Sequence, residues 1–376
     1  MSEINVGIVG CGNISTAYLQ LAPVFAGFKI TACSDLNAEV AASQASEFDC
    51  EALSVDALMA DPSINLVINL TVPAAHYEVS KLALSAGKHV YSEKPFVLSV
   101  AEGLSLLELA QANGLRVGSA PDTFLGGSHQ AARQYIDAGT AGTIVGGSCY
   151  VQSHGMENWH PDPTFFFQPG GGPILDMGAY YVSNLVQFLG PVKRVVAMGG
   201  RPFATRTVTS EPNPGAVIDV NVDTSVRAIL EFQQGAQVSF TASWDVWAHE
   251  HNHMELYGTT GSVYVPDPNR FGDSVRVSNG EAESQLAPLE VLGAANFEDS
   301  SGDMIANYRG VGLADMIAAI HEDRPHRCSG EMALHVLDIL TSISRSAEEA
   351  EFVNLATQCE RPAPLDDSAA RKLMRG

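Results

Sequence analysis

The sequence predicts an α/β protein with two domains, and three observations carry this prediction. Over the first third of the chain, short apolar runs alternate with helix-length stretches, which is typical of a doubly wound parallel sheet. Between about residues 143 and 280, the runs alternate or are apolar, with turns such as Gln234-Gly235 between them, which indicates a mostly antiparallel sheet. The length of 376 residues suits two domains. We therefore expect a parallel-sheet domain over residues 1–122 and an α+β domain with a large open, mostly antiparallel sheet over residues 123–376.

The composition indicates the cellular compartment and excludes some classes of partner. The chain carries 43 acidic against 21 basic residues and a net charge of −22, which argues against nucleic acid or an anionic membrane as partner. Its six cysteines form no CxxC pair, so reduced thiols in a reducing compartment are expected. Residues 1–5 lack the basic region and apolar stretch of a signal peptide, and no apolar run reaches the roughly 20 residues that span a bilayer. We expect a cytoplasmic protein.

The first strand, residues 6–9, leads into a glycine-containing loop and a helix that runs through Leu21. Gly10 permits the tight turn, Gly12 lets a pyrophosphate approach the backbone, and the N-terminus of the helix favours an anion. Ser15 stands where the dinucleotide fingerprint has its third glycine, and its small side chain still allows close helix–strand packing. The loop predicts a dinucleotide site that includes Gly10, Gly12, Asn13 and Ile14.

The second strand, residues 28–34, ends at Asp35, roughly 25 residues after Gly10. A carboxylate there binds the hydroxyls of an adenosine ribose and repels a 2′-phosphate, and neither Leu36 nor Asn37 supplies an arginine for that phosphate. NAD is therefore expected in preference to NADP. The alternative is that Asp35 only caps a helix beginning near Ala38.

Three further strands are expected at residues 66–70, 89–92 and 115–119, with helices through residue 86 and over 99–112 between them. Their C-terminal ends lie at the edge of the sheet where ligands bind. Lys94 is of special interest because Pro95 follows it, so that the backbone holds a cation at this edge. Cofactor contacts are expected from Thr71, Pro73, His76, Glu93 and Lys94, and substrate contacts from Lys94 and Asp122.

The second domain is predicted as strands with a few helices. Strands are expected at 143–153, 192–199, 224–232, 236–244, 253–257 and 275–278, and helices at 128–138, 174–189, 312–322 and 331–351. Residues 210–216 form a Pro/Gly-rich loop, and the polar tail after Glu360 is expected on the surface. The helix at 174–189 follows three glycines and carries Asp176 and Tyr180 on one face. An acid in a first helical turn and a tyrosine one turn later are also common without any catalytic role.

Four motifs together resemble the Gfo/Idh/MocA family of NAD(P)-dependent sugar and polyol oxidoreductases. They are Gly10-x-Gly12, Thr71-x-Pro73-x-x-His76, Glu93-Lys94-Pro95 and Asp176-x-Gly178-x-Tyr180, and the resemblance extends to the order of the domains, a Rossmann domain followed by an open sheet. It implies that Lys94, Asp176 and Tyr180 are catalytic. Many members carry histidine where this chain has Tyr180, which is like the branch of glucose–fructose oxidoreductase and the dihydrodiol and xylose dehydrogenases. The identity of the proton carrier therefore stays open.

The chemistry of alcohol oxidation gives these residues roles. The reaction needs a hydride acceptor and a base for the hydroxyl proton, and an unperturbed tyrosine, with a pKa near 10, is a poor base at neutral pH. A nearby lysine cation favours the phenolate. In the leading hypothesis Tyr180 passes the proton, Lys94 provides charge and orients the hydroxyl, and Asp176 positions Lys94 or the sugar. In the alternative, Lys94 carries the proton and Tyr180 is an anchor.

Aromatic and histidine residues of the second domain suggest further contacts. Trp159 and His160 precede the glycines and suit a sugar ring, although they could equally pack the sheet against the helix. The run at 307–309 (Asn-Tyr-Arg) could also contribute, without an assigned position. His249, His251 and His253 would share one face of a strand; we expect an inter-subunit or cleft face there and no metal site, since no matching cluster supports one.

The sequence thus predicts an NAD-dependent dehydrogenase acting on a secondary hydroxyl of a sugar, polyol or sugar derivative, or the reverse ketone reduction. A homodimer or homotetramer through the open sheet of the C-terminal domain is expected, since an open apolar face needs covering. Two other functions stay open: an NAD-dependent glycosidase that works by transient oxidation, and a non-enzymatic nucleotide-binding sensor. The sugar, the carbon and the direction are not predicted.

Overall fold

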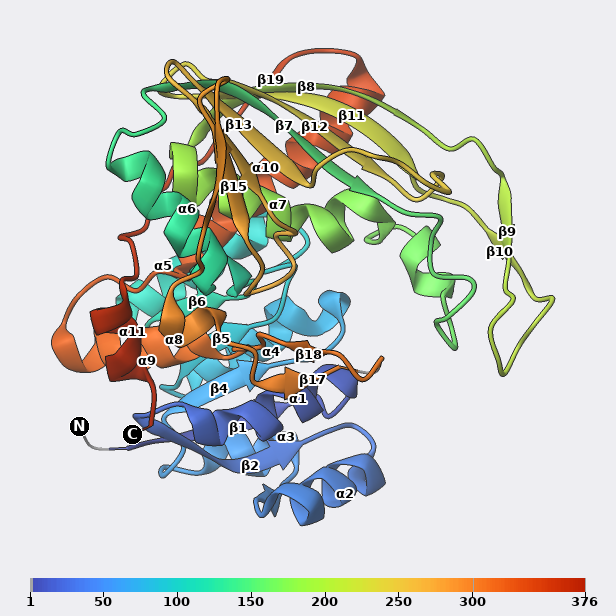
Figure 1. The fold of residues 1–376 in the computed structure, drawn as a ribbon. Helices are drawn as coiled ribbons and strands as arrows, with labels where there is room; N and C mark the ends of the chain where they lie inside the picture. The colour runs from blue at the N-terminus through green and yellow to red at the C-terminus, as the bar shows by residue number, and fades with distance from the viewer. Residues whose placement is uncertain (1–2, 300, 376) are drawn as a thin grey trace.

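The computed structural model describes residues 3–299 and 301–375. Figure 1 shows two layered halves, with a parallel sheet in the lower half and a large sheet curving across the top. The N-terminal half contains a six-stranded parallel sheet and the C-terminal half a mostly antiparallel sheet of nine strands. The predicted fold class is confirmed.

The parallel sheet has the strand order β3-β2-β1-β4-β5-β6. The chain order reverses between β1 and β4, which is where a doubly wound sheet opens a crevice for a ligand. The five strands that the sequence predicted are present, whereas the short and exposed β3 was not predicted. The strands are β1 (Ile4–Val9), β2 (Phe28–Ser34), β3 (Glu51–Ala52), β4 (Leu66–Asn69), β5 (His89–Ser92) and β6 (Val117–Ser119).

Helices cover both faces of this sheet, and local capping explains where several of them begin. At α5, the Ser99 hydroxyl accepts from the backbone N–H of Glu102, whose carboxylate accepts in turn from the backbone of Ser99. This reciprocal pair satisfies two N–H groups that the first turn leaves free. The helices are α1 (Asn13–Leu21), α2 (Ala38–Phe48), α3 (Val55–Ala60), α4 (His76–Ser85) and α5 (Val100–Ala112).

The large sheet has the order β16-β15-β14-β13-β7-β12-β11-β8-β19, in which β7 and β12 pair in parallel. Along β11, every second residue from Val226 to Phe232 is buried, which is the period of a strand with one covered face. Helices α7 and α10 cover that face (Figure 1). The strands are β7 (Ile144–Gln152), β8 (Val192–Gly200), β11 (Ser225–Phe232), β12 (Gln237–Ser243), β13 (Met254–Gly258), β14 (Ser262–Val265), β15 (Val275–Ser278), β16 (Glu283–Leu286) and β19 (Val353–Asn354).

A separate arm projects beyond the end of this sheet (Figure 1). It contains the hairpin β9 (Thr205–Thr207) and β10 (Val217–Asp219), and the predicted Pro/Gly-rich loop forms part of their connection. The arm packs on residues 156–167 through a small hydrophobic cluster of its own, formed by Met156, Phe166, Phe167, Val208, Ile218, Val220 and Trp244. This cluster lets the arm keep its shape without being part of the main core.

The C-terminal part of the chain returns to the parallel sheet. Arg375 Nη2 lies 2.8 Å from Glu3 Oε1, and the backbone N–H of Ala26 donates to the carbonyl of Leu373 at 2.8 Å, so the last helix lies against the start of the parallel sheet. The helices of this half are α6 (Gly127–Asp137), α7 (Gly172–Leu189), α8 (Glu290–Gly293), α9 (Val311–Glu322), α10 (Gly330–Glu349) and α11 (Asp367–Leu373), and a short hairpin joins β17 (Phe297–Glu298) to β18 (Met304–Ile305). The division at residue 122 remains a prediction.

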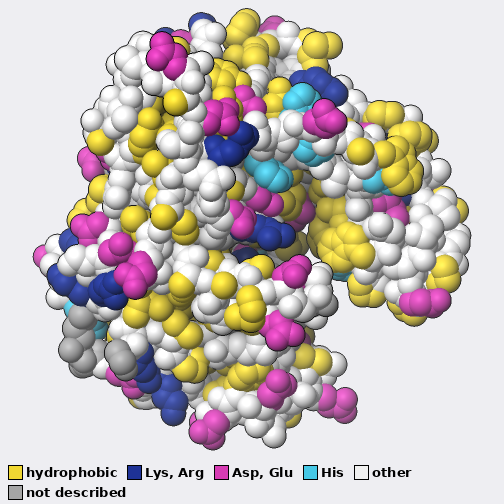
Figure 2. Space-filling view, viewed as in Figure 1, with side chains coloured by type: hydrophobic (Ala, Val, Ile, Leu, Met, Phe, Trp, Pro, Cys, Tyr) yellow, Lys and Arg dark blue, Asp and Glu magenta, His cyan; other side chains and the backbone are white. Residues whose placement is uncertain are grey.

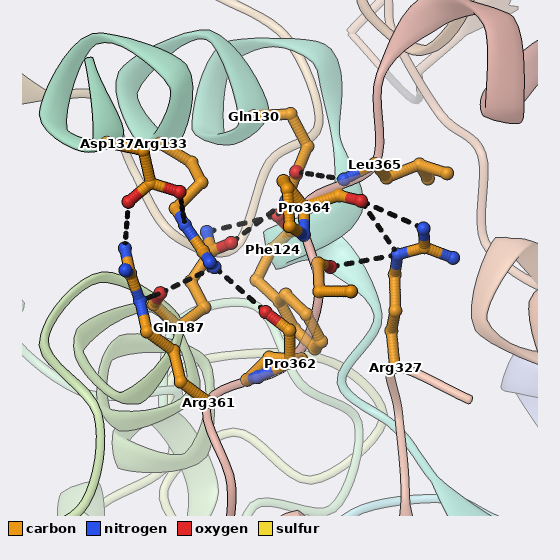
Figure 3. Close-up of polar contacts among 11 residues, drawn as sticks. Phe124, Gln130, Arg133, Asp137, Gln187, Arg327, Arg361, Pro362, Pro364 and Leu365 are labelled. Carbon is orange, nitrogen blue, oxygen red and sulfur yellow. Dashed lines mark hydrogen bonds and ion pairs between the residues drawn. The ribbon is translucent and has the colours of Figure 1, made fainter. Parts of the chain in front are cut away.

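The tail after Glu360 is not simply a surface segment, contrary to expectation. Leu365 and Leu373 are buried. Arg133 donates to the carbonyl of Pro362 and Arg327 to that of Pro364, while the N–H of Leu365 donates to Gln130 (Figure 3). A proline-rich extended segment cannot pair fully in a ladder, so these side chains satisfy its backbone groups.

No helix in the described part of the chain combines the length and apolar character that a membrane crossing requires.

Candidate active site

The loop after β1 has the geometry of an anion cradle. Gly10 adopts φ of +100°, and a Cβ there would lie 2.6 Å from the carbonyl of Leu70, so only glycine fits. At Gly12, in contrast, no described atom lies within 4 Å of an added Cβ. Helix α1 begins at Asn13 with no side-chain cap and no acid in its first turn, and Ile14 follows half-buried. Its free N–H groups are therefore available to a pyrophosphate approaching over Gly12.

The two glycines should respond differently to a single added methyl group. Gly10→Ala is expected to destabilise the fold by about 3 kcal/mol, because it combines a strained φ with a backbone clash. Gly12→Ala should leave the melting temperature nearly unchanged but weaken NADH binding by about tenfold or more, because its methyl fills the space a pyrophosphate needs. Thermal denaturation and an NADH titration measure both effects. Unaltered NADH binding by Gly12→Ala would contradict this account of the loop.

Asp35 is tied to the same loop. One carboxylate oxygen accepts from the N–H of Cys11 at 2.8 Å, and the other accepts from the N–H of Asn37 at 2.8 Å. Helix α2 is capped by Asn37, whose side chain accepts from the N–H of Glu39. The alternative role of Asp35 as the cap of this helix is therefore wrong. Its carboxylate stands next to the phosphate cradle, as a ribose-binding group would.

The segment after β4, the strand that pairs with β1, forms a second side of the crevice. The Thr71 hydroxyl donates to Asn69 at 2.7 Å, and Pro73 begins a short 3-10 turn. His76 is only 1% exposed, and its two ring nitrogens lie 2.7 Å from the carbonyl of Pro95 and 2.9 Å from that of Thr71. Burial lowers the pKa of His76, and its contacts with the two carbonyls oppose that effect. His76 thus connects two loops of the crevice, and its contact with the cofactor stays a prediction.

Lys94, Asp176 and Tyr180 meet although they come from different halves of the chain. Lys94 follows β5, and its Nζ lies 2.7 Å from Asp176 Oδ1 and 2.9 Å from the Asp176 carbonyl. The same Nζ lies 5.5 Å from the centroid of the Tyr180 ring. Asp176 and Tyr180 share a face of α7 one turn apart, as helical periodicity predicts. The lysine and the carboxylate remain 18% and 19% exposed, so the cluster opens to solvent.

The electrostatics of this cluster keep Lys94 charged. Burial alone lowers the pKa of Lys94, but the electrostatic effect of Asp176, followed by that of Tyr180, outweighs burial and raises the pKa above its ordinary value. Lys94 is therefore an ammonium ion at neutral pH. It can donate a hydrogen bond to an oxygen, but it has no free lone pair with which to accept a proton.

Glu93 lies beside Lys94 and is held by side-chain and backbone donors, and its contact with the cofactor stays a prediction. It is nearly buried, and its carboxylate accepts from the Tyr18 hydroxyl at 3.0 Å and from the N–H of Lys94 at 3.0 Å. Arg309 Nη1 lies 3.4 Å from Glu93 Oε1. Sequence reasoning noticed Arg309 without placing it, because no local pattern shows that the segment before α9 returns to the end of β5.

Asp122 has a structural position. It is completely buried, and its Oδ2 accepts from the N–H groups of Gly310 at 2.8 Å and Gly312 at 3.1 Å. Burial raises the pKa of this carboxyl, with the backbone donors opposing that effect. Its side chain turns toward the N-terminus of α9, where a carboxylate is favourable. A substrate contact from Asp122 stays a prediction.

Trp159 and His160 lie in the loop between β7 and α7, beside the arm. Trp159 is 63% exposed, and its ring meets His160 edge-on with centroids 5.4 Å apart. His160 also packs edge-on against Phe166 at 5.2 Å. Figure 2 shows the molecule hollowed between the arm and the parallel-sheet half, with hydrophobic side chains on the arm's inner wall. No direct contact joins Trp159 or His160 to the Lys94 cluster in the described residues.

The three alternating histidines do not share one face, because β13 begins only after them, at Met254. His249 and His251 stack with centroids 6.0 Å apart, and His251 also stacks on Tyr150 at 3.9 Å. His253 instead turns inward, where its Nδ1 lies 2.9 Å from the Tyr181 hydroxyl. In the described part of the chain, no group of three His, Cys, Asp or Glu side chains lies close enough to hold a metal ion.

Two family models match the chain. Residues 4–120 match the model described as an oxidoreductase family with an NAD-binding Rossmann fold. Residues 129–264 match the model described as a GFO/IDH/MocA C-terminal domain. The Rossmann domain and the C-terminal domain that the resemblance implies are thus both matched, in the expected order.

Individual oxidoreductases are also similar to this chain in sequence or in fold. An uncharacterised oxidoreductase of Schizosaccharomyces pombe, C115.03, is 28% identical over 52% of this chain, and the chain spans about half of that relative, 55%. Levoglucosan dehydrogenase of Pseudarthrobacter phenanthrenivorans is 26% identical over 75% of this chain and 78% of that protein. A solved structure titled levoglucosan dehydrogenase in complex with NADH and L-sorbose has a TM-score of 0.78 at 23% identity, over 95% of this chain and 100% of that one. This last likeness shows the fold.

Proposed function

The chain belongs to the Gfo/Idh/MocA oxidoreductase family, and on that premise we propose that it transfers a hydride between NAD and a secondary hydroxyl of a sugar, polyol or sugar derivative. One observation carries the proposal: an ammonium, a carboxylate and a phenol converge at the ligand edge of the parallel sheet. A bound nicotinamide would supply the hydride acceptor there. Gly10, Gly12 and Asp35 are the residues that would hold the dinucleotide.

The charge state of Lys94 favours Tyr180 as the proton carrier. In the oxidation direction, a base must take the hydroxyl proton as the carbinol C–H leaves as hydride. Lys94 holds its own proton at neutral pH and can only donate hydrogen bonds, whereas a phenolate at Tyr180 can accept the proton. The ammonium also stabilises the alkoxide character that develops on the substrate oxygen. Asp176 holds Lys94 in place through the 2.7 Å ion pair.

The cofactor preference rests on Asp35. Its carboxylate, fixed by the N–H groups of Cys11 and Asn37, would accept hydrogen bonds from both ribose hydroxyls and repel a 2′-phosphate. This supports NAD over NADP.

The exposed Trp159, beside His160, supports a sugar-like substrate, because an aromatic face suits the C–H face of a pyranose and an imidazole suits its hydroxyls. Levoglucosan dehydrogenase, a relative named for its sugar substrate, supports the same class.

Self-association through the open face of the large sheet is part of the proposal. The row across that face contains Met198, Arg227, Thr241 and Tyr150 on neighbouring strands. One side chain of this row is apolar, two are polar and the tyrosine is amphipathic, so the row is less apolar than expected and has the mixed composition typical of subunit interfaces. A homodimer or homotetramer would cover it.

All six cysteines are free thiols, which supports a cytoplasmic location.

A panel of sugars and cyclic polyols, each incubated with NAD or NADP, tests the proposed reaction by the absorbance of the reduced nicotinamide. We expect NADH to accumulate with a subset of these compounds, and more slowly with NADP than with NAD. A glycosidase working by transient oxidation would consume glycosides without net NADH, and a sensor would bind NADH without turnover. Either outcome would replace the dehydrogenase proposal.

A further inference from the structure

A buried arginine holds the projecting arm on the rest of the second domain. The side chain of Arg206, on β9, is 6% exposed, and its Nη1 lies 3.1 Å from Glu157 Oε1. Its Nη2 pairs with Asp245 Oδ1 and donates to the carbonyl of Trp244 at 3.1 Å. Both carboxylates are nearly buried as well. The guanidinium therefore joins three segments of the chain, which are the arm, the loop before α7 and the residues that follow β12.

The charges at this junction do not balance, because one arginine faces two carboxylates. Without Arg206, Glu157 and Asp245 would be two like charges in a site that water barely reaches, which is strongly unfavourable. Asp245 has a second partner, since its Oδ2 accepts from the Thr224 hydroxyl at 2.7 Å. Glu157 Oε2 has no hydrogen-bond partner among the described residues. The contact between the Glu157 side chain and the arm therefore depends on Arg206.

Backbone hydrogen bonds continue from this junction along the loop that carries Trp159 and His160. The carbonyl of Glu157 accepts from the N–H groups of Thr209 at 2.8 Å and Ser210 at 3.0 Å. The Ser210 hydroxyl donates to the carbonyl of His160 at 2.6 Å. The backbone on both sides of Trp159 is thus bonded to the arm, while the ring of Trp159 stays exposed.

The same loop ends against α7, the helix that contributes to the Lys94 cluster. A Cβ added to Gly171, which precedes the first residue of α7, would lie 2.6 Å from the carbonyl of Phe165. The N–H of Asn221, at the base of the arm, donates to the carbonyl of Phe167 at 2.9 Å. The arm and the loop therefore form one wall that leads to the start of α7, and the hollow in Figure 2 lies between the arm and the parallel-sheet half.

We propose that Arg206 is a positioning residue of the substrate site: it holds the arm on the loop, and the arm holds Trp159 and His160 at the wall of the hollow. The effect on substrate rests on the proposed function, in which these two side chains contact the sugar. Because Arg206 is buried, it acts through the loop and not by contact with the sugar. Its loss should weaken sugar binding more than it slows the chemical step, since Lys94 lies outside the arm and the loop.

Steady-state kinetics test this role with the panel compound that the wild type oxidises fastest. Arg206→Met should raise KM for that compound about tenfold, as expected when one hydrogen-bonding contact is displaced, and leave kcat within about threefold. Arg206→Lys should recover part of the loss, because an ammonium can still pair with one carboxylate. Ser210→Ala removes only the bond to the carbonyl of His160, and it should raise KM about threefold with little change in melting temperature.

Arg133→Met is the matched control for loss of a buried arginine. The side chain of Arg133, on α6, is 5% exposed, and its partners are Asp137 and the carbonyls of Gln187 and Pro362, none of them in the arm or the loop. This variant should lower the melting temperature as Arg206→Met does but leave KM within about twofold. An equal rise of KM in this control, or an unchanged KM in both Arg206→Met and Ser210→Ala, overturns the proposal.

Hydrogen exchange separates this role of Arg206 from the proposed function, because it needs no turnover. In the absence of sugar, Arg206→Met should speed amide exchange at residues 156–168 and 203–221, and Arg133→Met should not. Unaltered exchange in these segments overturns the role of Arg206 whether or not a sugar is oxidised. If exchange rises there while the wild type oxidises no compound of the panel, the anchoring by Arg206 is supported and the proposed function fails.

Discussion

Replacing Lys94 by alanine is expected to lower kcat/KM by about 10³-fold with an active substrate, within the range typical for loss of a group that assists proton transfer. The ammonium is the group that stabilises alkoxide character on the substrate oxygen and holds the 2.7 Å ion pair with Asp176. Because that stabilisation develops in the transition state, most of the loss should appear in kcat rather than in KM.

The matched control for this variant is Lys81→Ala. Lys81 is an exposed lysine of α4 that lies over the ring of Tyr77, and its loss should leave kcat/KM within about twofold because surface substitutions are usually near neutral. NADH titration should show that Lys94→Ala still binds the dinucleotide, whose phosphate loop is distant along the chain. If Lys94→Ala retained kcat/KM to within a few-fold, the assignment of this lysine would be wrong.

The second large effect is expected from Tyr180→Phe, with kcat reduced by about 10²–10⁴-fold. The ring of Tyr180 is nearly buried on α7, so phenylalanine keeps its packing while only the proton-carrying oxygen is lost. The melting temperature should therefore change little while kcat falls. Steady-state rates, measured beside thermal denaturation, give both quantities.

Tyr181→Phe is an informative control because it removes a hydroxyl from the next residue of the same helix. The Tyr181 hydroxyl lies 2.9 Å from His253 Nδ1 and donates to Asp267 at 3.3 Å, and burial, with Asp267 adding to it, raises its pKa well above the ordinary value. This tyrosine stays protonated and should contribute only stability, about 1–2 kcal/mol. If Tyr181→Phe lost as much kcat as Tyr180→Phe, the proton would not be assigned to position 180.

The side chains of three predicted site residues have structural partners that the sequence did not predict. The sequence placed His76, Glu93 and Asp122 near the ligand edge of the parallel sheet, and the structure agrees on the edge. What it adds is the direction of each side chain: the His76 ring lies between two carbonyls, Glu93 pairs with Arg309, and Asp122 accepts from the backbone at the start of α9. Strand periodicity ends at the last residue of a strand, so the orientation of residues beyond it depends on which segments pack there.

The sequence by itself determined features that depend on near neighbours in the chain. These are the parallel sheet, the loop that only glycine permits at residue 10, and the common face of Asp176 and Tyr180, since backbone geometry and helical period act over a few residues. The tertiary structure alone decided that Lys94 reaches Asp176 across 82 positions and that Arg309 returns to Glu93. Such meetings arise when whole elements bury their apolar faces together, and no local spacing encodes which polar side chains that packing brings into contact.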